Sequence, residues 1–186
     1  ILPIKETSDG YKFTGFRGLA SHGAVIGSLI GLYLYQLKFK KRSLLWILDR
    51  ITIPVSLGAC FVRLGNFFNS EIVGKYSNTD FGVVFLNRGE TLPRHPAQIY
   101  ESICYLFLFL FLRKTYKSDK KNMQGYLIGS FFVGMFSIRF IIEYLKESQG
   151  GLEDILGLFS KVQWLSIPLI LFGFYLIFRA TKLIKG

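Results

Sequence analysis

The sequence is poor in cysteine, histidine and charge, and each shortage excludes a class of protein. The two cysteines, Cys60 and Cys104, lie inside apolar runs. This pattern excludes a disulfide framework and a cysteine-based zinc site, and it predicts that both thiols are small packing groups. The two histidines are far apart in the sequence, so no metal site is expected. The sequence has no Walker loop, dinucleotide fingerprint or serine nucleophile elbow, and we expect no cofactor.

The low charge content argues against a soluble protein. Charged residues make up 19% of the 186 residues, against about 25% in soluble domains. Hydrophobic residues reach 51%, and the mean hydropathy is +0.36. A net charge of +11 would suit nucleic acid if it formed a stripe, but the basic residues come in short bursts between apolar runs. That pattern is typical of a membrane protein, so we expect a lipid bilayer as partner and no nucleic acid.

Five apolar stretches predict the architecture. A spanning helix needs about 20 residues. The second, fourth and fifth stretches are long enough; the first and third are short and would borrow flanking residues, or form buried or re-entrant helices. We predict an all-α polytopic membrane protein with about five transmembrane helices in a single integral-membrane domain over 1–186. The stretches lie near residues 22–37, 44–66, 98–112, 124–146 and 163–180.

The connecting segments predict the orientation. Twelve basic residues lie between the first two stretches, after the third and after the fifth, and four lie in segments 67–97 and 147–162. The positive-inside rule therefore places the Lys-rich turns and the C-terminus in the cytoplasm. Segment 67–97 becomes an extracytoplasmic loop, in which Phe81–Phe85 is expected to form a short strand or hairpin. Five crossings put residue 1 outside, which leads us to expect further helices upstream.

Several charged residues fall within the apolar stretches, where a charge costs roughly 2.5–3.5 kcal/mol on insertion scales. Asp49 and Arg50 lie near the predicted cytoplasmic end, and Lys146 lies near the outer end, so we expect these three to anchor at the interfaces. Arg63 and Arg139 are flanked by strongly apolar sequence and are candidate functional residues. Because Arg139 and Glu143 are four residues apart, a simple intrahelical ion pair is the alternative for them.

The richest stretch is Arg63-Leu-Gly-Asn66-Phe-Phe-Asn69-Ser-Glu71-Ile-Val-Gly74. Arg63 and Asn66 share a helix face, and Asn69 lies broadly on the same side. Polar groups at the outer end of a helix suit a recessed site for an anionic head group. An arginine fork donates two parallel hydrogen bonds to a phosphate. The alternative, a polar seam between helices, does not explain the use of arginine.

Two further segments carry candidate residues. His22 opens the first apolar stretch among small neighbours, and imidazole is a suitable base near neutral pH. His95 and Glu101 belong to Pro93-Arg94-His95-Pro96-Ala-Gln98-Ile-Tyr100-Glu101, at the start of the third stretch. Pro96 suits the first turn of a helix, and the same residues are equally compatible with a cap on the outer face.

Together these blocks resemble the bacterial phosphatidylglycerol–prolipoprotein diacylglyceryl transferase family. Arg63 to Gly74 resembles the family signature Arg-x-Gly-Asn-Phe followed by Asn, Glu and Gly. Ser21-His22-Gly23-Ala24 resembles its His-Gly-Gly segment, and Arg94 to Glu101 its Arg-His-Pro-x-Gln-x-Tyr-Glu segment. Phe136 to Lys146 resembles its late helix with Arg-x-x-x-Glu. Lys146 departs from the arginine common there, and Ala24 replaces a frequent glycine. The resemblance also implies roughly two upstream helices.

The resemblance implies a reaction in the bacterial cytoplasmic (inner) membrane. The diacylglyceryl group of phosphatidylglycerol moves to the lipobox cysteine thiol of a prolipoprotein signal peptide, the first step of lipoprotein maturation. We expect His22 to be the base and Arg63, helped by Arg139, to bind the lipid phosphate. Glu143 would orient Arg139. The remaining expected substrate-contacting residues are Asn66, Asn69, Glu71, Gly74, His95 and Glu101.

Two other readings remain open from the sequence. The chain is also compatible with a small membrane transporter or channel with an arginine-lined anion path. Transporters often show internal repeats or paired broken helices. The sequence shows neither, although glycine and proline around residues 54–58 could break one helix. A non-catalytic lipid-binding scaffold is the third reading.

The predicted orientation is testable by labelling. In intact cells, a membrane-impermeant thiol reagent should label Asn87→Cys, in the outer loop, and should not label Lys117→Cys until the cells are opened. Labelling of Lys117→Cys in intact cells would reverse the predicted orientation.

Overall fold

The computed structural model describes residues 4–7, 10–13, 21–39, 42–77, 81–147 and 159–185. The chain divides into two compact units, Ile1–Leu44 and Leu45–Gly186. The first unit contains an antiparallel hairpin of β1 (Ile4–Thr7) and β2 (Gly10–Phe13), with Ile4 opposite Phe13, followed by helix α1 (Ser21–Phe39). The hairpin is an addition to the helices predicted from the sequence.

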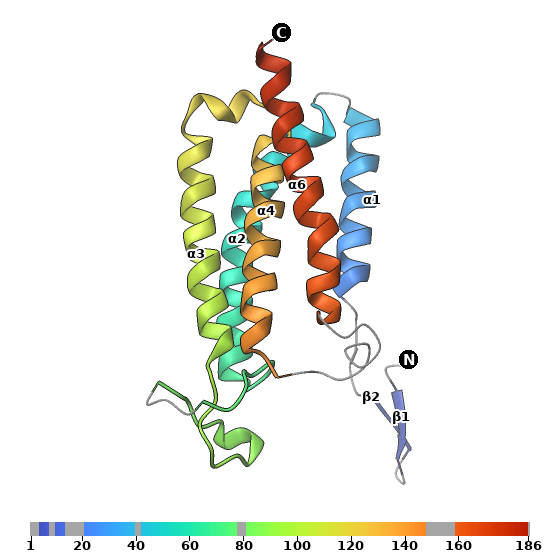
Figure 1. Ribbon diagram of the computed structural model, residues 1–186. Coiled ribbons are helices and arrows are strands. Elements are labelled where there is room, and N and C mark those ends of the chain that lie inside the picture. Colours follow the sequence, from blue (N-terminus) through green and yellow to red (C-terminus); the bar gives the residue numbers. More distant parts are fainter. Residues whose placement is uncertain are drawn as a thin grey trace. The chain divides into compact units, whose positions relative to one another are not determined.

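The second unit is built from four long helices that run side by side (Figure 1). Segments 69–77 and 81–96 lie at one end, and the turn after α3 and the end of α6 lie at the other. Pro54 lies inside α2 without interrupting it. The elements are α2 (Leu44–Phe68), η1 (Leu86–Arg88), α3 (Ala97–Tyr116), η2 (Asp119–Asn122), α4 (Tyr126–Ile142), η3 (Glu143–Leu145) and α6 (Lys161–Lys185).

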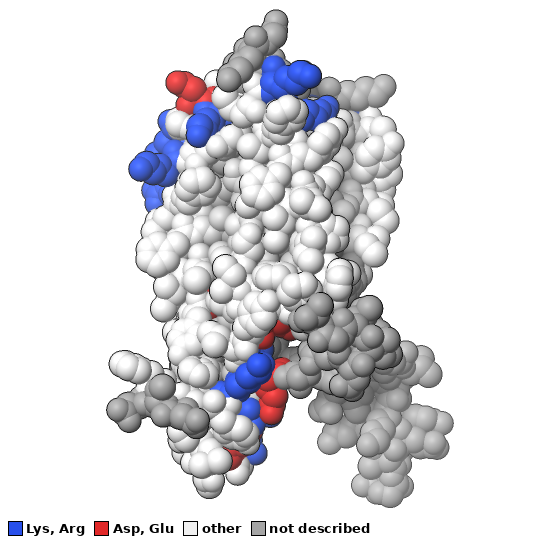
Figure 2. All heavy atoms as spheres, viewed as in Figure 1, with Lys and Arg blue, Asp and Glu red and all other residues white. Residues whose placement is uncertain are grey.

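The five helices coincide with the five predicted stretches, and three are long and apolar enough to cross a membrane: Leu44–Phe68, Tyr126–Leu145 and Lys161–Lys182. These are the second, fourth and fifth stretches, the ones the sequence identified as long enough. On the face drawn in Figure 2, the charged side chains gather at the two ends of the helices and the long middle is uncharged. This distribution is that of a membrane protein.

The core of the second unit lies between α2, α3 and α4. Cys60 is buried, and the Ser102 hydroxyl donates a hydrogen bond to the Cys60 carbonyl at 3.0 Å. Burial confirms the packing role predicted for this cysteine. The buried residues of the cluster are Cys60, Tyr105, Leu108, Leu112, Leu127 and Met135.

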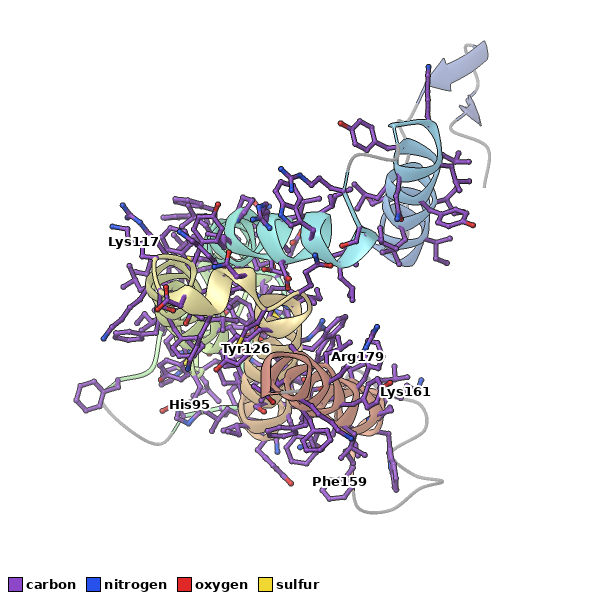
Figure 3. The ribbon with its side chains drawn as sticks, turned by 90° about the horizontal axis from the view of Figure 1, so that it is seen from above. His95, Lys117, Tyr126, Phe159, Lys161 and Arg179 are labelled. Atoms are coloured by element: carbon purple, nitrogen blue, oxygen red, sulfur yellow. The ribbon has the colours of Figure 1, made fainter. Side chains whose placement is uncertain are left out.

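Glycines let α4 approach its neighbours closely. A Cβ on Gly129 would lie 2.8 Å from the carbonyl oxygen of Gly173, and a Cβ on Gly173 would lie 2.8 Å from that of Gly129. Small residues at such a crossing are typical of helix packing in membranes. Seen along the helices in Figure 3, α4 lies between α3 and α6, and Lys117 lies on the side of α3 away from α6.

The sequence led us to expect that Asp49 anchors at the membrane interface. In the structure its side chain is buried instead, at 1% exposure. Its Oδ2 accepts a hydrogen bond from the backbone N–H of Gly125 at 2.7 Å, and its Oδ1 accepts one from Ile128 at 2.8 Å. Gly125 has no side chain with which to cap α4, so α2 supplies the capping carboxylate. A negative charge at a helix N-terminus is also favoured by the helix dipole. Arg50 behaves differently and stacks on the Trp46 ring, 3.4 Å from its centroid.

Removal of this cap should destabilise the protein. Asp49→Ala leaves two buried N–H groups without acceptors, which costs on the order of 1–3 kcal/mol for each group. We expect a clear fall in the thermal unfolding midpoint in detergent. Asp119→Ala, which removes an exposed carboxylate from the turn before α4, is the matched control and should leave the midpoint unchanged. Equal midpoints for Asp49→Ala and the unmodified protein would contradict the capping role.

Candidate functional site

Short extended segments tie together the ends of α2, α3 and α4. Segment 73–77 follows α2 and lies between segment 93–95, which leads into α3, and segment 145–147, which follows η3. On one side the Gly74 N–H donates to the His95 carbonyl at 3.1 Å, and on the other the Lys75 N–H donates to the Leu145 carbonyl at 2.8 Å.

Within Phe81–Phe85, the predicted short strand is reduced to one bridge, between Val83 and Arg94.

Gly74 is required where these segments meet. A Cβ there would lie 2.4 Å from the His95 carbonyl oxygen and 2.9 Å from that of Leu145. Real side chains do not tolerate contacts this short, so the residue must be glycine for the three segments to approach. The sequence led us to expect a substrate contact at Gly74, and the groups that approach this glycine in the structure belong to His95 and Leu145.

The end of α2 is shaped by two residues with positive φ. Ser70 has φ of 56°, its N–H bonds to the Phe67 carbonyl, and the Glu71 N–H bonds to the Asn66 carbonyl. This is the Schellman pattern of helix termination. Ile72 follows with φ of 54°, a conformation that a β-branched residue rarely adopts. The surrounding hydrogen bonds hold this strained turn, which places Glu71 back beside α2.

At the centre of the site lies Glu101, which has no exposed surface. Its Oε2 is 2.7 Å from Arg63 Nε, an ion pair outside the angular range of a hydrogen bond. Its Oε1 accepts a hydrogen bond from Lys146 Nζ at 2.9 Å and a long one from the Tyr105 hydroxyl at 3.4 Å. One carboxylate on α3 therefore joins α2 to the segment after η3.

A chain of side-chain contacts continues from Arg63 towards the end of α2. Arg63 Nη1 donates to Asn66 Oδ1 at 3.2 Å, and Asn66 Nδ2 donates to Glu71 Oε2 at 2.8 Å. The fully buried Gln98 donates from Nε2 to the Glu71 carbonyl at 2.6 Å, while its Oε1 has no hydrogen-bond partner among the described residues. The structure thus brings together Arg63, Asn66, Glu71 and Glu101, as the sequence predicted for the site.

Glu143 contacts groups other than Arg139. Its Oε1 accepts a hydrogen bond from the Ser160 hydroxyl at 3.0 Å, and its Oε2 lies 3.5 Å from Lys146 Nζ. In the part of the chain that the structure describes, no ion pair joins Glu143 to Arg139. Lys146 is 7% exposed, so its predicted interfacial position is wrong, because its ammonium group pairs with two carboxylates.

Arg139 carries an unused donor. Its Nε is buried and has no hydrogen-bond partner among the described residues. The guanidinium groups of Arg139 and Arg63 are both close enough to the Tyr105 hydroxyl to interact with it electrostatically. A buried N–H without an acceptor is costly in a low-dielectric interior, and an anionic ligand would supply the missing acceptor.

A second ion cluster holds segment 88–94 against segment 145–147. Arg94, 3% exposed, pairs with Glu90 and with Glu147 at 3.1 Å, donates to the Gly74 carbonyl and lies over the Tyr76 ring. Arg88 lies 2.9 Å from Glu90. The hydrogen bond from Arg94, supported by Arg88 and opposed by partial burial, holds the pKa of Glu90 below its ordinary value. This clamp therefore persists in mild acid and weakens only as the pH falls through that lowered pKa.

The other predicted residues make no side-chain hydrogen bond or ion pair with Glu101 among the residues that the structure describes. Asn69 is exposed at the end of α2. His95 is half-buried, its ring centroid lies 6.3 Å from that of Tyr100, and its backbone bonds to segment 73–77. His22 is the second residue of α1 in the first unit, and its side chain lies outside the described residues.

Sequence reasoning missed part of this site. Lys146, Tyr105, Gln98 and Ser160 all contact the predicted residues. The spacing Glu101-x-x-x-Tyr105 and the spacing Glu143-x-x-Lys146 place each pair on one helix face and were the available signals. Ser160 carries no such signal, because it lies on the segment leading into α6.

The fold and the site define a helical membrane protein in which buried arginine, lysine and glutamate side chains meet near one end of the bundle. The sequence profile of the family described as prolipoprotein diacylglyceryl transferase matches residues 4–179. The chain therefore belongs to the prolipoprotein diacylglyceryl transferase family.

Individual relatives agree with this assignment. The chain is 43% identical over 184 residues to a protein of Bacteroides fragilis, covering 98% of this chain and 65% of the relative. It is 46% identical over 166 residues to a protein of Chloroherpeton thalassium, covering 89% and 61%. It is 44% identical over 165 residues to one of Tolumonas auensis, covering 89% and 63%. All three are named phosphatidylglycerol–prolipoprotein diacylglyceryl transferase. The chain spans just under two thirds of their length.

Proposed function

We propose that the protein transfers the diacylglyceryl group of phosphatidylglycerol to the lipobox cysteine thiol of prolipoproteins. Family membership and the names of the relatives support this activity. The structural observation that carries it is the unpaired donor of Arg139 beside the arginine of the Arg63–Glu101 pair. A lipid phosphate would supply the acceptor that the Arg139 donor lacks.

Arg63 and Arg139 are the proposed phosphate ligands. Arg63 pairs with Glu101 through Nε and donates one hydrogen bond from Nη1 to Asn66. Arg139 adds its buried Nε–H. Arginine suits this role because its planar fork donates parallel hydrogen bonds to two phosphate oxygens. Asn66, Asn69 and Glu71 are proposed to hold the glycerol hydroxyls, while His95, Gly74 and Glu143 shape and support the site.

The proposed reaction is a displacement at carbon. The cysteine thiolate attacks the carbon of the diacylglyceryl group that is bonded to the phosphate ester oxygen. An S–C bond forms at this carbon as its C–O bond breaks. Glycerol phosphate leaves with the bonding electrons, and its phosphate changes from a monoanionic diester to a monoester with nearly two charges. Cations at the phosphate interact more strongly with the product-like transition state than with the bound lipid. This difference lowers the barrier.

The thiol must lose its proton before or during attack. An ordinary cysteine titrates near a pKa of about 8.5, so only a few per cent is thiolate at neutral pH. His22 remains the proposed base, because imidazole accepts a proton in this pH range. The proton then leaves on the imidazole, and the negative charge of the thiolate passes through the displacement to the phosphate.

The proposed setting is the cytoplasmic membrane, crossed about five times by this chain. The polar end of the bundle, with Glu101 and the outer loop, faces outwards, and the Lys-rich turns face the cytoplasm. Two lines of support are the apolar spans and the excess of basic residues in alternate connections. Both substrates are membrane-embedded, so they enter between helices. The rival reading as a transporter loses its one expected helix break, since α2 continues through Pro54 to Gly58.

The activity is tested with the full-length protein in phosphatidylglycerol vesicles and a lipobox peptide. We expect glycerol phosphate release that requires the peptide cysteine and is absent with a Cys→Ala peptide. Arg63→Lys keeps the charge but loses the fork, and should lower turnover on the order of 100-fold, as loss of transition-state donors does elsewhere. Arg50→Lys, at a cation stacked on Trp46 outside the site, is the matched control and should retain turnover.

Two results would overturn parts of this proposal. Full turnover in both Arg63→Lys and Arg63→Ala would remove Arg63 from the phosphate site. No cysteine-dependent release by a folded protein would reject the transferase activity and favour the transporter or the scaffold.

A further inference from the structure

Both oxygens of Glu101 are already engaged by protein cations. Arg63 Nε lies 2.7 Å from Oε2, and Lys146 Nζ lies 2.9 Å from Oε1, with the Tyr105 hydroxyl also on Oε1 at 3.4 Å. The side chain has no exposed surface. Each oxygen of this carboxylate therefore already faces a protein cation, and the side chain is closed off from solvent. Its contacts hold the side chains of Arg63 and Lys146 in position.

The contact with Arg63 is at the Nε edge of the guanidinium. A free arginine side chain has many rotamers, and roughly 2 kcal/mol of rotamer entropy opposes holding it in one. Glu101 fixes the Nε edge, and Asn66 accepts one hydrogen bond from Nη1 at 3.2 Å. Contacts at two of its three nitrogens, Nε and Nη1, therefore hold the planar group in one orientation, and neither of these two contacts uses Nη2.

Lys146 supplies a second positive charge beside the buried Glu101 carboxylate. An unpaired buried carboxylate is strongly unfavourable. Lys146 Nζ also lies 3.5 Å from Glu143 Oε2, so it separates two carboxylates that would otherwise repel each other. Its backbone is fixed by the bridge to Gly74, which pins the ammonium group in place.

We propose that Glu101 is a positioning residue of the transfer reaction. It orients Arg63 towards the lipid phosphate and is itself held by Lys146. This inference rests on the proposed function. It adds that Glu101 affects the reaction only through its effect on Arg63. Glu101 therefore contributes to turnover only while an arginine is present at position 63.

A double-mutant cycle on the full-length enzyme in phosphatidylglycerol vesicles tests this role. Glu101→Gln should lower kcat about 10- to 100-fold, as small misplacements of reacting groups do. The KM for phosphatidylglycerol should not rise, because the substitution removes a negative charge near the bound anion. In the Arg63→Lys background, Glu101→Gln should add less than about threefold to the loss, since the group it orients is already absent.

Asp119→Asn is the matched control. It neutralises an exposed carboxylate in the turn before α4, away from the site, and should leave kcat within about twofold in both backgrounds. Thermal midpoints of all variants, measured in detergent, report the folded state. If Glu101→Gln does not fold, Lys146→Met replaces it in the cycle, with the same expected dependence on Arg63. Lys146→Arg should restore turnover because it keeps a cation beside Glu101.

The outcomes separate this inference from the proposed function. If the unmodified enzyme shows no cysteine-dependent release, the proposed function fails. If it is active and the losses of Glu101→Gln and Arg63→Lys multiply, Glu101 acts independently of Arg63 and the positioning role is overturned. A raised KM with unchanged kcat in Glu101→Gln would instead show direct contact with the lipid.

Discussion

The site depends on a single buried carboxylate, that of Glu101, held between Arg63 and Lys146. Charges in an apolar interior are expensive, and they persist only when paired and supported by further hydrogen bonds. Here each charge lies on a different part of the chain: α2, α3 and the segment after η3. Pairing them therefore fixes the relative positions of three backbone segments as well as three side chains. The orientation of Arg63, and with it the proposed phosphate site, follows from that constraint.

The two ends of the second unit are organised by different polar devices. At one end, extended segments joined by backbone hydrogen bonds and the clamp around Arg94 hold the loop against Lys146. At the other, the carboxylate of Asp49 caps α4 and ties it to α2. Between them, close contact at Gly129 and Gly173 packs α4 on α6. A bundle fixed at both ends and tightly packed in the middle can keep a charged site in place within an apolar surround.

The sequence predicted the positions of the helices well, because apolar runs near 20 residues have few other structures available in a membrane. It also named Arg63, Asn66, Glu71 and Glu101 within a larger set of candidate site residues, through helical spacing and the family resemblance. It did not predict the partners. Asp49 was expected at the interface from its depth alone, but its acceptor atoms meet N–H groups 76 and 79 residues away. Lys146 was expected to reach the interface, but the turn to η3 and the bridge to Gly74 direct it inwards. Such contacts depend on tertiary packing, which no local pattern encodes.

The central claim, that Glu101 orients Arg63 and leaves it facing a lipid phosphate beside Arg139, is tested most directly by a distance measurement. Solid-state NMR can detect dipolar coupling between ¹⁵N in the arginine side chains and ³¹P of phosphatidylglycerol in vesicles containing the full-length protein. The account predicts coupling that is reduced in Arg63→Lys, reduced in Arg139→Lys and weakened at Arg63 in Glu101→Gln. Coupling that is the same in all three variants as in the unmodified protein would contradict it.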